Sequence, residues 1–154
     1  MNDEEAEEHE DISPRKVGGF MLLCAVFLPY WLMMTPSDFY TWAGIWMLKI
    51  FEAENTIHHV IKLVGINLSW GLLIFVGGPQ ILFAYFMYRL YTGKTTTKNA
   101  FVVGSLGIIP PLIFLLNALI LGIYPTIPIP LSLLLGYVLV KKYPPPVDTP
   151  PWLQ

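Results

Sequence analysis

Three long stretches of the chain contain no Asp, Glu, Lys or Arg, and they constrain the fold more than any other feature of the sequence. They cover residues 17–37, 63–88 and 99–140. Each is longer than the roughly 20 apolar residues that a helix needs to cross the hydrocarbon core of a bilayer. Only 13% of all residues are charged, about half the share in a soluble globular domain. The pattern favours an integral membrane protein over a soluble domain, a disulfide scaffold or a nucleic-acid binder.

The longest charge-free stretch predicts two membrane spans rather than one. As a single helix it would be about twice as long as the hydrocarbon core is thick, and prolines interrupt it within residues 122–130. Proline lacks a backbone N–H and disfavours helix in the residue before it. We therefore expect spans within 17–37, 63–88 and 99–122, and a short fourth span at 130–143.

A further helix is expected at 39–54, between the first two spans. Thr35, Pro36 and Asp38 have the residue types and spacing of a helix start with a capping box. Lys49 at the centre of a membrane-crossing helix would cost roughly 3 kcal/mol, so this helix should lie along the interface. The predicted fold class is an all-α integral membrane protein with four transmembrane helices, the fourth short, and an extracytoplasmic interfacial helix between the first two.

The charged residues predict the orientation and the limits of the membrane domain. With four spans, seven of the nine basic residues fall on one side, and basic residues collect on the cytoplasmic side of membrane proteins. Seven of the eleven acidic residues lie in the first eleven positions, where a self-repelling block buries nothing. We expect cytoplasmic termini, with an acidic disordered tail at 1–16, a four-helix membrane domain at 17–143 and a proline-rich tail at 144–154.

The polar residues within the predicted spans are few, and none of them is Asp, Glu, Lys, Arg or His. Proton relays and intramembrane hydrolases need such groups at depth, so the sequence predicts no catalytic residue, cofactor or metal ligand. Asn67 and Asn117 should lie at similar depth on antiparallel helices. An interhelical hydrogen bond is one use for them, and contact with a ligand is the other.

Prolines disturb three of the predicted spans near one level of the membrane. They are Pro29, Pro79 and Pro110, and the carbonyl groups that such kinks free are poorly accommodated by lipid. Gln80 lies at the same level. One interpretation is a pocket with Gln80 on its wall. The other is that ordinary packing accommodates the kinks and that Gln80 is an interhelical contact.

Glu52, Glu54, His58 and His59 form the one cluster in the sequence that resembles a set of metal ligands or acid–base groups. On a helix, Glu54 and His58 would be one turn apart, and Glu52 and His59 would share a stripe with Asn55. A zinc site needs three or four protein ligands, so each stripe is incomplete. We interpret the cluster as a solvated polar face, with metal binding and pH sensing by histidine as alternatives.

The sequence as a whole predicts a small non-catalytic protein of the cell membrane, an accessory, scaffold or assembly subunit that acts through helix–helix contacts. Its expected partners are membrane lipids and a membrane protein or a second copy of the chain, without nucleic acid. The alternative is a protein that binds or transports a small molecule or lipid at the proline-kinked level. An enzyme that uses the outer Glu and His cluster is the third possibility. Architecture alone transfers no function.

Overall fold

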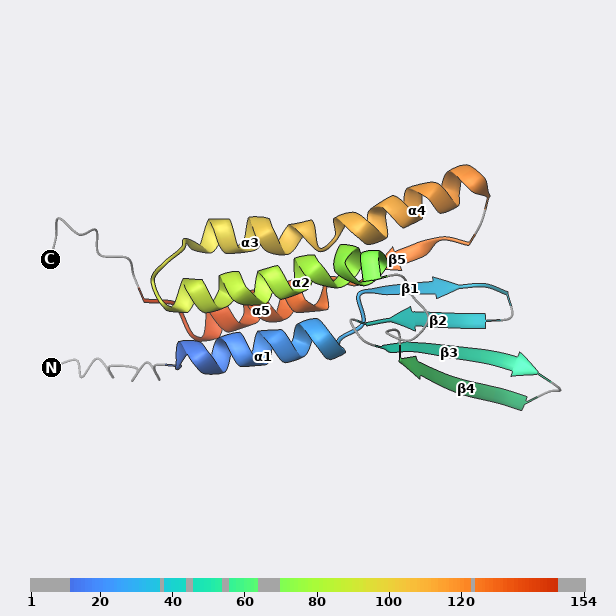
Figure 1. Ribbon diagram of the computed structural model, residues 1–154, viewed down its shortest axis with the longest axis horizontal. Helices are drawn as coiled ribbons and strands as arrows, with labels where there is room; N and C mark the ends of the chain where they lie inside the picture. The colour runs from blue at the N-terminus through green and yellow to red at the C-terminus, as the bar shows by residue number, and fades with distance from the viewer. Residues whose placement is uncertain are drawn as a thin grey trace, which may run out of the picture.

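The chain forms a layer of helices that continues at one end into an antiparallel sheet (Figure 1). The computed structural model describes residues 12–36, 38–43, 46–53, 56–63, 70–122 and 124–146. The helices are α1 (Pro14–Phe27), α2 (Trp70–Tyr91), α3 (Thr97–Leu106), α4 (Ile109–Leu121) and α5 (Leu131–Lys142). The strands are β1 (Trp31–Met34), β2 (Asp38–Trp42), β3 (Trp46–Ala53), β4 (Thr56–Leu63) and β5 (Thr126–Pro128).

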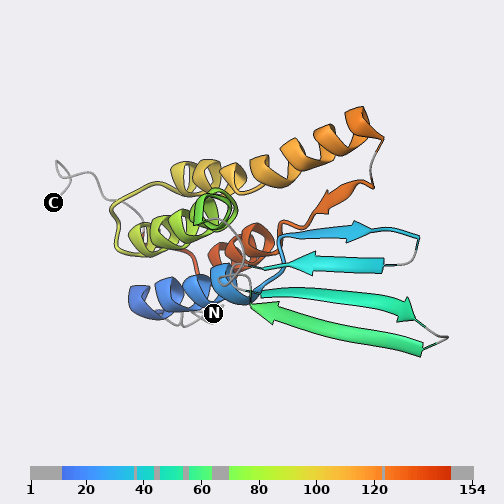
Figure 2. The ribbon, with the colours of Figure 1, turned by 45° about the vertical axis from the view of Figure 1, so that its right-hand side comes forward.

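The sheet brings together two parts of the chain that are far apart in sequence. Its strand order is β4-β3-β2-β1-β5, and each neighbouring pair is antiparallel. The first four strands follow one another along the chain, whereas β5 returns after α4 and pairs with the free side of β1 (Figure 2). Trp31 in β1 therefore lies opposite both Trp42 and Pro128. Among the strands of the described residues, the edge strand β5 is the one that comes from the second half of the chain.

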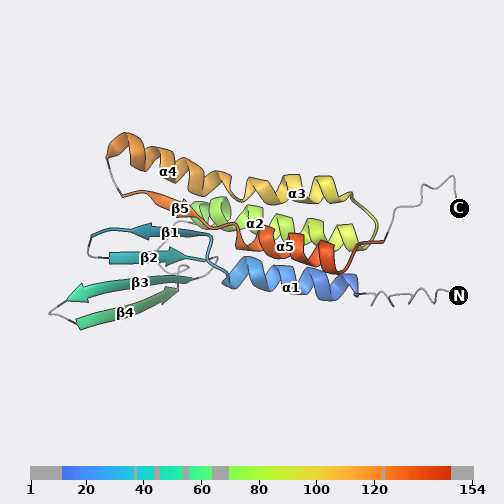
Figure 3. The same ribbon diagram turned by 180° about the vertical axis from the view of Figure 1, so that it is seen from behind.

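The helical layer is built around α2. Helices α1, α2, α3 and α5 run side by side when seen from the front and from behind (Figures 1 and 3), and α2 packs against both α1 and α3. Phe83 of α2 is fully buried. A Cβ atom at Gly104 of α3 would lie 2.8 Å from the Phe83 ring, and one at Gly136 of α5 would lie 2.7 Å from it. Glycine at these two positions makes room for the aromatic ring.

The predicted all-α fold class is wrong, because the described chain contains a five-stranded antiparallel sheet. Residues 39–54, predicted as an interfacial helix, contain most of β2 and all of β3. Among the described residues, one helix is long and apolar enough to cross a membrane, namely Thr97–Leu121, which runs through α3 and α4. The predicted bundle of four transmembrane helices is therefore contradicted as well. The first charge-free stretch is divided between α1, which has 14 residues, and β1.

Short apolar segments account for this error. Periodicity alone does not distinguish a short buried strand from part of a helix. Aromatic and β-branched residues favour strands, and the run Phe39, Tyr40, Thr41 and Trp42 contains only such residues. The bias of residue type towards strand therefore outweighs the apolar character that suggested a helix.

Thr35 makes the hydrogen bond expected of a helix cap, but the bond closes a hairpin. Its Oγ1 accepts from the backbone N–H of Asp38 at 2.9 Å, and its own N–H donates to the Asp38 carbonyl at 2.8 Å. A helix cap also accepts from an N–H two or three residues later. The same local pattern serves both structures, and the strand-forming residues after Asp38 decide between them.

Candidate functional site

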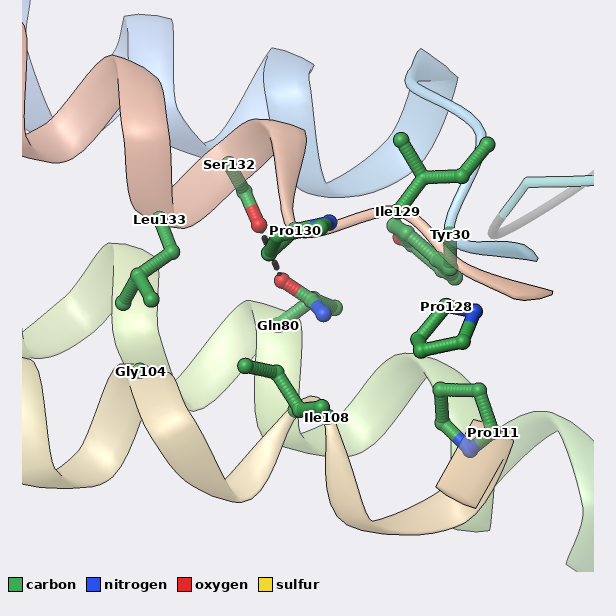
Figure 4. Close-up of a pocket in the computed structure, with 11 residues that line it drawn as sticks. Tyr30, Gln80, Gly104, Ile108, Pro111, Pro128, Ile129, Pro130, Ser132 and Leu133 are labelled. Carbon is green, nitrogen blue, oxygen red and sulfur yellow. Dashed lines mark hydrogen bonds between the residues drawn. The ribbon is translucent and has the colours of Figure 1, made fainter. Parts of the chain in front are cut away.

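A small cavity lies where the helices meet the sheet (Figure 4). It has about 10 Å³ of space for the centre of a water molecule, and roughly 10–15 Å³ is the least that holds one water. The cavity lies between α2, α3, the α3–α4 turn and the starts of α4 and α5. The two segments that connect the helices with the sheet, at Tyr30 and at Ile129, complete its wall. The lining residues are Tyr30, Gln80, Gly104, Gly107, Ile108, Pro111, Pro128, Ile129, Pro130, Ser132 and Leu133.

A buried hydrogen bond crosses one side of the cavity. The Ser132 hydroxyl of α5 donates to Oε1 of Gln80 on α2, and the two residues are only 4% and 5% exposed. A buried amide or hydroxyl costs free energy unless it is hydrogen-bonded, and this bond satisfies the Ser132 hydroxyl as a donor and the Gln80 Oε1 as an acceptor. Gly107 adjoins the Gln80 amide, since a methyl group at position 107 would collide with Nε2. The bond thus joins α2 to α5 beneath the turn between α3 and α4.

Tyr30 brings a second buried polar group to the cavity. The residue is 3% exposed, and its hydroxyl has no hydrogen-bond partner within the described residues. Burial raises the pKa of the Tyr30 hydroxyl above the value of about 10 that is usual for tyrosine. An unsatisfied buried donor costs about 1–3 kcal/mol. The hydroxyl itself is closed off from water within the packed residues around the cavity.

The backbone of Tyr30 continues the pairing of the sheet up to the point where α1 ends and α5 begins. The Tyr30 N–H donates to the carbonyl of Trp42 in β2 at 2.7 Å, and its carbonyl accepts from the N–H of Ile129 at 2.7 Å. On β5, the Thr126 hydroxyl donates to the carbonyl of Pro111 in α4 at 3.4 Å. The cavity therefore lies in the region that connects the helical layer to the sheet. We call this region, around Tyr30, Gln80, Thr126 and Ser132, the joint.

The chemistry available at this joint is hydrogen bonding. Its lining residues supply an amide, an aliphatic hydroxyl and a phenol whose pKa lies well above neutral pH. Among those lining residues there is no carboxylate, imidazole, thiol or amine, the groups most often used in general acid–base catalysis. The arrangement suits the retention of a single water or a small polar group.

The residues predicted for a polar pocket or interhelical contact are separated in the structure. Gln80 lines the cavity, whereas Asn117 is exposed on α4 and its Nδ2 donates to the Ile113 carbonyl of the same helix at 2.8 Å. Asn67 lies outside the described residues. Neither Tyr30 nor Ser132 was predicted from the sequence as a site residue. The proximity of Tyr30 to Pro29 was a usable signal, but no pattern pointed to Ser132.

The histidines of the predicted outer cluster lie on a strand. His58 and His59 are neighbours on β4, so their side chains point to opposite faces of the sheet. Nε2 of His58 is 2.8 Å from the hydroxyl of Thr56, and the His58 ring stacks on Phe51 with centroids 5.3 Å apart. The two imidazoles consequently do not converge on one site.

The acidic residues of that cluster, Glu52 and Glu54, were expected to share the faces of a helix with the histidines, and the structure does not contain that helix in the residues it describes. Glu52 is on β3, with its Cα paired with that of Ile57 on β4. Glu54 lies outside the described residues. The described ranges contain no group of three or more His, Cys, Asp or Glu residues placed to hold a metal ion. The helical spacing on which both stripes depended is absent here, because the segment forms a hairpin.

The sheet carries a cluster around Lys49, in which the amine contacts two aromatic rings and a carboxylate, and the sequence did not predict it. Nζ of Lys49 lies 5.1 Å from the ring centre of Tyr40, 4.8 Å from that of Phe51 and 3.5 Å from Oδ2 of Asp38. Hydrogen bonding with Tyr40 and attraction to Asp38 raise the pKa of Lys49. A cation over aromatic faces is stabilised. Asp38, Tyr40 and Trp42 alternate along the sequence, so on a strand their side chains share one face of the sheet. This spacing indicates the cluster only once the segment is recognised as a strand.

No protein-family model, curated protein or solved structure matches this chain. The function is therefore inferred from the molecule's own features, above all the distribution of its charged and apolar residues, and with it the joint around Tyr30 and Gln80.

Replacing Tyr30 with phenylalanine is expected to raise stability at neutral pH by up to about 1 kcal/mol, because the change removes a buried hydroxyl without a partner among the described residues. The wild type should lose stability above about pH 10, since the unfolded phenol releases its proton before the folded one. The variant should lose less. Thermal unfolding at neutral and alkaline pH measures both effects. A clear loss of stability at neutral pH would show that the hydroxyl is hydrogen-bonded in the cavity.

Proposed function

We propose that this chain is a non-catalytic membrane protein, an accessory or scaffold subunit whose helical layer lies among lipids and whose sheet lies towards the side of the membrane opposite the basic residues. The helix Thr97–Leu121 is the segment proposed to cross the membrane. The end of the layer that carries the start of α1 and the end of α5 is proposed to face the cytoplasm. The partner is a second membrane protein or another copy of the chain.

The surface of the helices supports a lipid environment. Large apolar side chains are exposed on all five helices, and Ile74 and Ile120 are 68% and 80% exposed. Soluble monomeric proteins rarely expose contiguous apolar patches larger than a few hundred Å². Lipid chains are as apolar as leucine, so the same side chains cause no aggregation in a bilayer.

The single observation that carries the proposal is the accumulation of basic residues at one end of the molecule. Seven basic residues lie at or beside the helix ends that are farthest from the sheet (Figure 1). They are Arg15, Lys16, Arg89, Lys94, Lys98, Lys141 and Lys142. The other two basic residues, Lys49 and Lys62, lie in the sheet, as do the acidic residues of the described ranges, Asp38 and Glu52. An apolar zone with basic residues at one end favours a cytoplasmic location for that end.

The joint supports a structural role for the protein. Its cavity of about 10 Å³ is far below the roughly 300–1,000 Å³ of a small-molecule site. The sheet is bonded to the helices by the Thr126 hydroxyl, which donates to the Pro111 carbonyl of α4. A rigid platform beside the membrane suits protein contact better than turnover of a substrate at this cavity.

Thiol labelling tests the proposed placement. In a Cys24→Ser background, Ile57→Cys on β4 should react with an impermeant reagent on intact cells, because Ile57 is exposed on the sheet. Thr97→Cys at the start of α3 should react only after permeabilisation. The protein should also stay with the membranes after alkaline carbonate extraction. The reverse labelling pattern would contradict the orientation, and carbonate release would contradict the membrane location.

Native mass spectrometry after gentle detergent extraction tests the accessory role. We expect a protein complex heavier than the 17.5 kDa chain, which resolves into this chain and its partner when the collision energy is raised. Detergent at denaturing concentration provides the control for adventitious aggregation. A lone chain that carries only lipid would contradict the accessory function while leaving the membrane location intact.

A further inference from the structure

An apolar groove runs between α1 and α2 at the basic end of the helical layer. Its volume is about 420 Å³, which lies within the range of small-molecule sites and far exceeds that of the joint cavity. The residues that line it are Arg15, Gly18, Gly19, Leu22, Ile81, Ala84, Tyr85 and Tyr88. It is separate from the joint, with which it shares no lining residue.

Two adjacent glycines explain why the groove is present. A Cβ atom at Gly18 would lie 3.0 Å from Cβ of Tyr88, so glycine there lets α1 and α2 approach closely. A Cβ atom at Gly19 would meet no other atom within 4 Å. The helices therefore touch at one glycine and leave open space beside the next. This space has the walls of two helices and an open side.

The groove combines apolar walls with positive charge at one end. Leu22 and Ile81 are about half exposed, and Arg15 lines the groove in the first turn of α1. The guanidinium carbon of Arg89 lies 6.0 Å from the ring centre of Tyr85. One Arg89 nitrogen donates to the Lys94 carbonyl at 3.1 Å, which leaves other N–H groups of the guanidinium for a further acceptor.

This combination identifies the chemistry of an occupant. Apolar walls fit a hydrocarbon chain, and arginine binds phosphate oxygens through a planar set of donors. The acidic residues of the described ranges, Asp38 and Glu52, lie in the sheet at the opposite end of the molecule. An amphipathic anion would therefore place its chain along the groove and its charged group at the basic end.

We infer that the α1–α2 groove binds one acyl chain of an anionic glycerophospholipid, with the lipid phosphate at Arg15 and Arg89. The inference rests on the membrane location proposed above. The surrounding lipid is as apolar as the groove walls, so the groove holds an acyl chain without discriminating between lipids. Selectivity comes instead from the two arginines, and the lipid should be distinguished by its headgroup charge.

Retention of lipid by the purified full chain tests this inference. The chain is placed in nanodiscs of phosphatidylcholine and phosphatidylglycerol in equal amounts, and the lipids that stay bound on release are counted by native mass spectrometry. Arg15→Gln removes the charge that lines the groove, and Gly19→Leu fills the open space beside Gly18. Lys98→Gln and Ser105→Leu are the matched controls, because they make equivalent changes at exposed positions on α3.

The wild type should retain one phosphatidylglycerol in preference to phosphatidylcholine. Arg15→Gln should reduce this preference about five-fold, the effect of roughly 1 kcal/mol per basic residue near a charged lipid surface. Gly19→Leu should abolish retention of the single lipid. Both controls should behave as the wild type does.

Three results would overturn the inference. The first is no headgroup preference in the wild type, as would follow if the acidic segment 3–11 neutralised the arginines. The second is an equal loss of preference in Lys98→Gln, which would assign the effect to the basic end as a whole. The third is undiminished retention in Gly19→Leu. Failure of the chain to enter nanodiscs would instead contradict the proposed membrane location, so the two failures are distinguishable.

Discussion

Replacing Phe83 with alanine is expected to lower the free energy of unfolding by about 3–5 kcal/mol, the usual cost of deleting a large buried aromatic ring. Phe83 is fully buried and belongs to the core cluster that includes Val17, Met21 and Met87. Its ring also contacts Phe101 of α3, with centroids 6.0 Å apart. Alanine would leave a cavity at the point where three helices meet. Equilibrium unfolding in detergent micelles, followed by tryptophan fluorescence, measures the loss.

Phe75→Ala is the matched control for this experiment. Phe75 is on the same helix but is 43% exposed, so its truncation should cost much less than that of Phe83. A double-mutant cycle sharpens the test. Gly136→Ala alone should cost about 1–3 kcal/mol through overpacking against the ring, and Phe83→Leu should relieve most of that cost. Similar losses for Phe83→Ala and Phe75→Ala would show that Phe83 is not the centre of the core.

The helices are the part of this fold that the sequence predicts best in position. Each of α1, α2 and α5, and the continuous helix Thr97–Leu121, lies largely within a region expected to be helical. The signal is strong there because a run without charged residues extends over several turns. The lengths of the helices and their placement in the membrane were predicted less well, since the first charge-free run is divided between a helix and a strand.

The sheet was not predictable in the same way, because its signals are short and ambiguous. The hydrogen bond from the Asp38 N–H to Thr35 fits a helix cap and a hairpin equally well. The pairing of β5 with β1 joins Met33 to Thr126, and no local pattern specifies a partner so far away in sequence. Strand pairing of this kind is decided by tertiary contacts rather than by propensity.

Part of the joint could be predicted from the sequence. Gln80 stands out as an amide in a long apolar run, and Pro79 marks the same level. Ser132 does not stand out, since a serine near the start of a helix is common. Its significance depends on a hydrogen bond across 52 positions of sequence. A polar residue in an apolar helix can therefore be singled out before its partner can be named.

Replacing Gln80 with leucine should lower the free energy of unfolding by about 1–2 kcal/mol. The side chain keeps an apolar stem of similar reach, but the hydroxyl of Ser132 loses the amide oxygen to which it donates. Ser132 is 4% exposed, so water replaces that acceptor only if it enters the joint. Unfolding in detergent micelles, under the conditions used for Phe83→Ala, measures the change.

A second variant separates the hydrogen bond from the shape of the joint. Ser132→Ala should also destabilise the protein, because the Gln80 amide then loses its donor in a buried place. The double variant, Gln80→Leu with Ser132→Ala, should be more stable than the sum of the two losses predicts, since neither polar group remains to be satisfied. Strictly additive losses would show that the two side chains do not act as a pair. An unchanged Gln80→Leu variant would show that the amide is hydrated in the folded protein, and the joint would then be open to water rather than closed.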